Sequence, residues 1–206
     1  MAFQARMGLR GSAIAGLALI ISGCVSLGVD APDSLLTLSS ENVAPVGANT
    51  ANGDQATDNA IAVLTPETPA KLDVLRVPVN VSETEIAYLP DAFWIEKPAR
   101  LFRRVLGENL RAKGGEGGPI VLDSDVTPLR ASTLLRGTLS ELSYDAQTGE
   151  VVVRYDAIRS DPQGSTATRR FEARESGVIA DAASVGPALN RAVNTVAVEV
   201  ADWMLP

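Results

Sequence analysis

Residues 134–174, LLRGTLSELSYDAQTGEVVVRYDAIRSDPQGSTATRRFEAR, contain three strand-like runs that two turns separate. Alternation of apolar and polar residues with period two is typical of strands that bury one face. In the first run, residues 134–144, the apolar parity changes between Leu139 and Leu142, which predicts a β-bulge near residues 140–141. The stretch as a whole predicts an antiparallel meander.

The two turns contain residue types that favour reversal of the chain. Residues 145–149, DAQTG, form a predicted hairpin loop, and residues 161–164, DPQG, place Pro at the second turn position. The second strand follows the first turn, and the third covers residues 166–174. The residues expected to face the core are Val151, Val153, Tyr155 and Ala157 in the second strand and Ala167, Phe171 and Ala173 in the third.

Two segments with helical periodicity flank the meander. In the first, within residues 94–112, Pro98 suits the first helical turn and the glycines at 114–115 suit the helix end. The second covers residues 182–204. The predicted apolar stripes are Leu101, Phe102, Val105, Leu106 and Leu110 in the first helix, and Leu189, Val193, Val196, Val200 and Trp203 in the second.

Two further strands are predicted before the first helix. Residues 75–81 alternate in polarity, and Pro78 among them predicts an edge strand or a bulge because it donates no ladder hydrogen bond. Residues 85–89 form a second short strand that ends at Pro90. The fold expected for residues 71–206 is therefore α+β, with two helices packed on one face of a mainly antiparallel sheet.

The N-terminus has the features of a secretory signal peptide. Arg6 and Arg10 precede an apolar run at residues 13–21, and a run of about nine residues is too short for a bilayer core that needs roughly 20. The following Ile-Ser-Gly-Cys at 21–24 resembles the lipobox of bacterial lipoproteins. The pattern predicts removal of residues 1–23 and lipidation of Cys24, against the alternative of a free or buried Cys.

Residues 24–70 are predicted to be the lipidated N-terminus and a largely flexible tether. They are rich in Ala, Asn, Thr, Asp, Gly and Pro, and residues 25–32 and 45–59 offer little apolar area to offset the entropy of ordering. Short strands at residues 35–38 and 60–64 are compatible with this composition. In enterobacteria, an Asp directly after the lipidated Cys retains a lipoprotein at the inner membrane. Here Val25 follows Cys24, which by analogy favours the outer membrane.

Composition excludes several classes of function. The chain has no His and one Cys, which rules out Ser-His-Asp, Cys-His and His-ligated metal chemistry. Asp123 and Asp125 are read as a solvated loop, and the glycine-rich residues 114–118 as a connector. Loss of two Arg with the signal peptide lowers the formal charge from −7 to about −9, so nucleic acid is an unfavourable partner. We therefore expect no enzyme activity, no cofactor and no metal.

Three aromatic residues and one basic cluster are the remaining candidates for contacts. Tyr88, Trp94 and Trp203 are partner anchors or core residues, and the core is the more frequent role for an aromatic at a helix end. The cluster of Arg100, Arg103 and Arg104 is read as the charged outer face of a helix. The residues Arg169 and Arg170 lie on opposite faces of one predicted strand.

Residues 88–106, YLPDAFWIEKPARLFRRVL, combine a Tyr, a Trp, a Pro and an amphipathic helix. With residues 188–203 as a closing helix, this segment resembles the auxiliary lipoprotein component of ABC-type transport systems, the PqiC-like group. The resemblance implies a periplasm-facing, non-enzymatic subunit that works with an ABC ATPase, a permease and a substrate-binding protein of the mammalian-cell-entry type. Such systems move lipids between envelope membranes. A homo-oligomer is compatible with this role.

Two other classes remain open from the sequence. One is a periplasmic enzyme held by a lipid anchor, which carboxyl groups of raised pKa in a polar cleft would support. The other is a general lipoprotein of outer-membrane biogenesis or assembly. An adjacent set of genes for the ATPase, permease and entry-type protein would separate the transport role from both.

The lipobox gives the first testable prediction. Cleavage before Cys24 and acylation of its thiol and amine should be visible by mass spectrometry of the N-terminal peptide from membranes. The variant Cys24→Ala should leave the membrane fraction, because it cannot carry the acyl chains that together anchor a lipoprotein firmly. Equal membrane retention of this variant and the native chain would exclude the lipid anchor.

Overall fold

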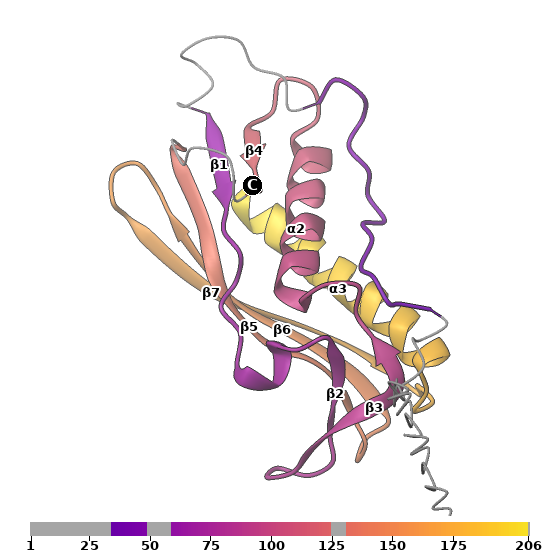
Figure 1. The fold of residues 1–206 in the computed structure, drawn as a ribbon. Coiled ribbons are helices and arrows are strands. Elements are labelled where there is room, and N and C mark those ends of the chain that lie inside the picture. The colour runs from indigo at the N-terminus through magenta and orange to yellow at the C-terminus, as the bar shows by residue number, and fades with distance from the viewer. Residues whose placement is uncertain (1–33, 49–58, 125–130, 206) are drawn as a thin grey trace, which may run out of the picture. The chain divides into compact units, whose positions relative to one another are not determined.

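The computed structural model describes residues 34–48, 59–124 and 131–205 (Figure 1). They belong to a compact unit, Pro32–Pro206, whereas a first unit, Met1–Ala31, lies outside the described residues. The signal peptide, Cys24 and residues 25–32 are therefore not described, nor are residues 49–58 of the stretch expected to be flexible.

The predicted meander is present as three long antiparallel strands: β5 (Thr133–Asp145), β6 (Glu150–Ser160) and β7 (Thr166–Ser176). The expected bulge is confirmed, because the register between β5 and β6 shifts between Leu139 and Glu141. As a result both Leu139 and Leu142 are fully buried.

The other edge of β5 is shared by two strands. Strand β1 (Ala60–Val63) runs parallel to the start of β5, and β2 (Arg76–Asn80) runs parallel to its end. Between them, the chain continues the edge contact through main-chain bonds such as Glu67 N to Gly137 O, 2.9 Å, before the 3-10 helix η1 (Ala70–Leu72). Residues before the boundary expected at 71 thus belong to the sheet.

Two short strands complete the sheet. Strand β4 (Ile120–Leu122) pairs in parallel with β1, and β3 (Ile86–Phe93) pairs in antiparallel with β2. Seven strands therefore form one mixed sheet in which the longest ladders are antiparallel. Pro78 lies at a register shift between β2 and β3, so of the two predicted alternatives the bulge is the one observed.

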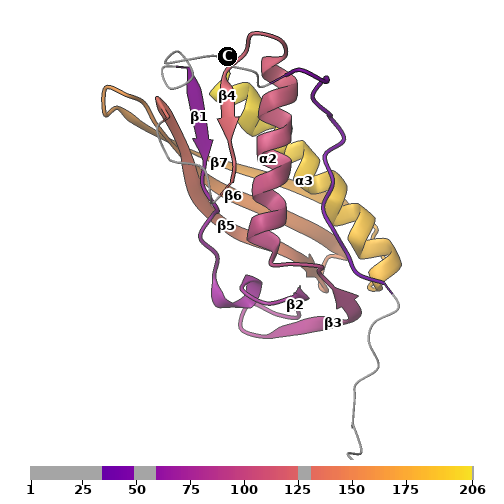
Figure 2. The same ribbon diagram turned by 45° about the horizontal axis from the view of Figure 1, so that its top comes forward.

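Helices α2 (Pro98–Gly114) and α3 (Ala182–Met204) cover one face of the sheet, which confirms the α+β class (Figures 1 and 2). Pro98 occupies the first turn of α2, and Gly115 ends it with φ 60°, a conformation that glycine adopts at little cost. At the start of α3 the Asp181 side chain accepts a hydrogen bond from Ser184 N, 2.7 Å. Both predicted apolar stripes face the core, except that Trp203 is half-buried.

An extended segment, residues 34–44, crosses the two helices and is called the strap below (Figure 2). Its only strand contact is an isolated bridge from Leu36 to Trp94, rather than the short strand considered for residues 35–38. The strap is fixed by Asn194 of α3, whose amide donates to Ser39 O and accepts from Glu41 N, at 2.9 and 2.8 Å. Asn194 is buried for this reason, although its side chain is polar.

The second half of the strap is held by side chains of α2. Asn109 is buried, accepts from the amide of Asn42 at 3.0 Å and donates to Ser40 Oγ at 3.0 Å. Further along, Ala44 N donates to Glu108 Oε1, 2.8 Å. Helix side chains therefore satisfy strap groups that would otherwise need water.

Two sequence expectations are corrected by the structure. Strand β3 does not end at Pro90 but continues to Phe93, because β3 is the outermost strand on this side and needs no hydrogen bond from a proline there. Asp91 adopts a φ of 55° within it. Strand β4 was not expected at all, since three residues give too short a pattern to recognise.

Trp94 generates a stability prediction because it is 1% exposed and its indole Nε1 has no hydrogen-bond partner among the described residues. Trp94→Ala should lower the free energy of unfolding by about 3–5 kcal/mol, measured by urea denaturation. Trp94→Phe should cost clearly less, since it keeps most of the apolar volume and loses no hydrogen bond. Val43→Ala, at a residue 74% exposed, serves as the control.

An unchanged melting temperature for Trp94→Ala together with loss of partner binding would instead assign Trp94 to an interface.

Candidate interaction surfaces

The face of the sheet opposite the helices presents charged side chains from three neighbouring strands. Alternate residues of a strand point to opposite faces, so the burial of Phe171 on the helix side turns Arg170 and Glu172 of β7 outward. The register then places Arg170 opposite Asp156 and Glu172 opposite Arg154 on β6. Opposite charges meet across the strands, which favours this register.

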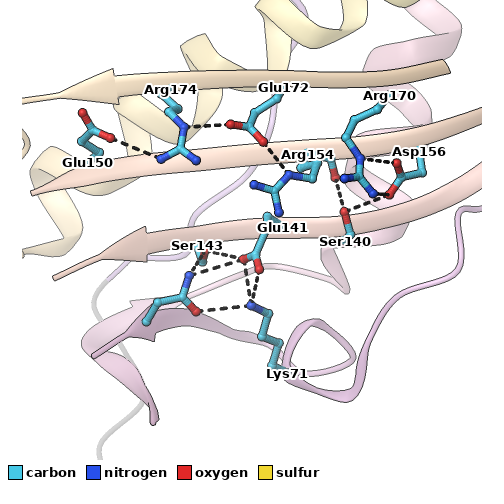
Figure 3. A network of polar contacts seen from close by, with 11 residues as sticks. Lys71, Ser140, Glu141, Ser143, Glu150, Arg154, Asp156, Arg170, Glu172 and Arg174 are labelled. Atoms are coloured by element: carbon cyan, nitrogen blue, oxygen red, sulfur yellow. Dashed lines mark hydrogen bonds and ion pairs between the residues drawn. The ribbon is translucent and has the colours of Figure 1, made fainter. Parts of the chain in front are cut away.

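Four charged residues of β6 and β7 form a continuous chain of ion pairs (Figure 3). Glu172 bonds Arg154 Nε at 2.5 Å with one oxygen and Arg174 Nε at 2.8 Å with the other. Arg174 reaches on to Glu150 at 3.4 Å. The planar guanidinium of Arg174 is thereby held between two carboxylates.

A second pair lies next to this chain on the same strands. Arg170 contacts both oxygens of Asp156, with Nε to Oδ1 at 2.6 Å and Nη2 to Oδ2 at 3.2 Å. Ser140, at the bulge of β5, donates to Asp156 Oδ2 at 3.3 Å. The bulge therefore brings a hydroxyl to a carboxylate on the next strand (Figure 3).

A third group surrounds Glu141, the residue after the bulge. Lys71 Nζ lies 2.6 and 2.8 Å from its two carboxylate oxygens, and Ser143 Oγ donates to it at 2.7 Å. Asn80 links the group to β2 through a bond from Nδ2 to Ser143 Oγ, 3.0 Å. We call this group and the two before it, drawn in Figure 3, the outer-face network.

Two carboxylates on β6 and β7 have a pKa below its ordinary value. The hydrogen bond from Arg170 lowers the pKa of Asp156. Burial acts to raise the pKa of Glu172, but the hydrogen bonds from Arg154 and Arg174 outweigh it, so the pKa is lowered. A lowered pKa suits ion pairing rather than proton transfer near neutral pH.

The three aromatic candidates do not come together. Trp94 lies in the core, whereas half-buried Tyr88 on β3 lies under the guanidinium of Arg76, 4.9 Å from its ring centroid. Trp203 packs edge-to-face on Phe171 at 5.8 Å. Each therefore has an intramolecular partner or a buried position.

The candidate charge clusters are also separated. Arg103 is buried and donates to Thr65 Oγ1 at 2.8 Å, whereas Arg104 pairs with Glu96 at the surface, so they form no common anion site. Asp123 binds Arg111 at 2.5 Å, and Asp125 lies outside the described residues. Arg169 lies over the Phe171 ring on the helix side, opposite Arg170.

Three cavities in the described part of the chain are small. One of about 230 Å³ lies between the strap, α2 and α3, beside Asn42 and Asn109. Others of about 190 and 260 Å³ lie near Ser132 and near Leu38. Pockets for drug-sized ligands are typically larger, about 300–1,000 Å³.

Residues 34–48, 59–124 and 131–205 were also compared with the requirements of a metal site and of a membrane-spanning helix. No group of three or more His, Cys, Asp or Glu side chains there could hold a metal ion. Within the same ranges, no helix combines the length and apolar character needed to cross a bilayer.

Sequence reasoning did not find the outer-face network. Its signal was present as charged residues on the side opposite the buried aromatics, namely Glu150, Arg154 and Asp156 of β6 and Arg170, Glu172 and Arg174 of β7. The turn at 161–164 fixes the register that pairs them. The charge pattern and this register together would have predicted the ion pairs Arg154–Glu172 and Asp156–Arg170.

A family model described as "ABC-type transport auxiliary lipoprotein component" matches residues 37–201. A solved Xanthomonas campestris protein is similar over 84% of this chain and 94% of its own, with 16% identity and a TM-score of 0.64. An uncharacterized protein matches 83% of this chain and 99% of its own, with 15% identity and a TM-score of 0.62. At these identities the structural likeness shows the fold alone. No curated protein matches the sequence.

The lowered carboxylate pKa values predict acid sensitivity. A group whose pKa is lower in the folded chain stabilises it fully above the unfolded pKa, about 4, and this contribution is lost as the pH falls through the folded value. Stability measured by urea denaturation should therefore decline below about pH 4.5. Glu172→Gln should reduce that decline by at most about 1 kcal/mol, because the pair is partly exposed.

Glu199→Gln, on the exposed side of α3, is the matched control. Identical pH profiles for the native chain and Glu172→Gln would show that Glu172 contributes nothing to the acid response.

Proposed function

The chain belongs to the family of ABC-type transport auxiliary lipoprotein components, and from this premise we propose that it is a periplasm-facing subunit of a lipid transport system. The system is of the mammalian-cell-entry type, and the subunit docks or stabilises it at the envelope without catalysing a reaction. Its acyl anchor lies in the outer membrane. The observation that carries the proposal is the family match itself, which extends from the strap to the last turns of α3.

The geometry supports a docking role on the outer face of the sheet. Neither α2 nor α3 covers this face, although Lys71 of η1 reaches it at Glu141 (Figures 1 and 2). The network there holds four cations and four carboxylates, so it is electrically balanced although the chain as a whole is acidic. A balanced face with side chains fixed in ion pairs can approach another protein without strong long-range repulsion. We place the entry-type protein on this face.

The proposal predicts co-purification. Affinity purification of the native lipoprotein in mild detergent should recover the entry-type protein, and deletion of the gene should give the same envelope permeability defect as deletion of the permease. If no such protein is recovered after cross-linking and the two deletions differ, the transport role fails. The general role in outer-membrane biogenesis then replaces it.

A pair of variants tests the docking face. Thr168 is exposed on β7 and shares its outward face with Arg170, so Thr168→Arg adds bulk there without breaking a described ion pair. It should abolish recovery of the partner. The matched control, Thr195→Arg on the exposed side of α3, should retain it. Equal recovery with both variants would exclude the outer face but leave the transport role intact.

A further inference from the structure

Three large aliphatic side chains are exposed near the end of the molecule where the described chain begins. Leu35, Leu75 and Ile95 are 49%, 46% and 57% exposed. We call these three residues the apolar end. Single exposed aliphatic residues are ordinary on protein surfaces, so their mutual position decides whether they matter.

Main-chain bonds bring the three residues together. Leu36 N donates to Phe93 O at 2.7 Å and Ile95 N donates to Leu36 O at 2.9 Å, so Leu35 and Ile95 lie on adjoining segments. Trp94 N donates to Leu75 O at 2.9 Å, which places Leu75 beside the same segment. Three stretches that are distant in the sequence therefore adjoin at this end of the sheet, and each carries one exposed aliphatic side chain.

The polar residues around the apolar end suit an interface between lipid and water. Lys97, two positions beyond Ile95, pairs with Asp73 at 2.6 Å, so this charge is compensated. Arg76 lies over the Tyr88 ring next to Leu75. Tyr and Arg have an apolar body and a polar tip, and such residues are favoured at the headgroup level of membranes.

The short tether favours the lipid bilayer as the surface that the apolar end contacts. Nine residues separate Cys24 from Ser34, the first described residue, and they extend over at most about 30 Å. Acyl chains on Cys24 thus keep the apolar end close to the bilayer surface at a high effective concentration. A weak apolar contact is sufficient under this condition.

From these observations we propose that the apolar end lies against the lipid bilayer and inserts Leu35, Leu75 and Ile95 at the headgroup boundary. The contact is in addition to the acyl anchor and fixes how the folded unit stands on the membrane. It requires lipidation at Cys24 but no partner protein.

Site-specific fluorescence can test this contact in the purified lipoprotein. Cys24 is the only Cys, so once it is acylated a new thiol is the single reactive one. Ile95→Cys carries an environment-sensitive dye in vesicles of phosphatidylethanolamine with a minor share of phosphatidylglycerol and a headgroup-proximal doxyl lipid. The dye should shift to the blue and be quenched by the doxyl lipid. Leu35→Cys is the second reporter if Ile95→Cys folds poorly.

The control is Val198→Cys, at another exposed aliphatic residue of the chain. Gly186 of α3 lies against Leu36, and Val198 is twelve residues, about 18 Å, further along the helix. Its dye should be quenched several-fold less. Equal quenching at both positions, or none at residues 95 and 35, would overturn the proposal; a protein bound at this end would give the latter result.

Discussion

Strand β5 is the element on which the arrangement of the sheet depends. It pairs with β6 along its whole length on one edge, while its other edge is divided between β1, the 64–67 segment and β2. Close approach is needed in the middle, where a side chain at Gly137 would collide with the Asp156 carbonyl oxygen. The bulge that follows lets β5 bury both leucines beside it and still direct Glu141 to the outer face.

The elements that could be predicted from the sequence are those whose signal is local. The meander is specified by period two and by turn residues at 145–149 and 161–164, and α3 by a continuous apolar stripe with an Asp cap. In each case, the apolar residues that define the local pattern are the same residues that are buried in the core, so local and tertiary preferences agree. The bulge was visible for the same reason, because a change of parity cannot be buried without it.

What could not be predicted depends on partners that are distant in the sequence. Strand β4 is three residues long and is a strand only because β1 lies beside it. Asn194 is buried because the strap crosses it, and the sequence of α3 alone gives no sign of that contact. Pro90 looked like a strand end because the sequence does not reveal which strand is outermost. The pairs of the outer-face network likewise follow from register rather than from composition.

The strap is the segment with which the described part of the chain begins. A force on the N-terminal side of the strap acts first on the main-chain bonds of Leu36 to Phe93 and Ile95. It then acts on the side-chain amides of Asn194 and Asn109, which bind the rest of the strap. Each such bond contributes only about 1 kcal/mol, but they are spread along two helices and accompany the burial of Leu38. Because both helices pack on the core, the strap cannot swing independently of it. A pull transmitted to the strap therefore acts on both helices and on the core beneath them.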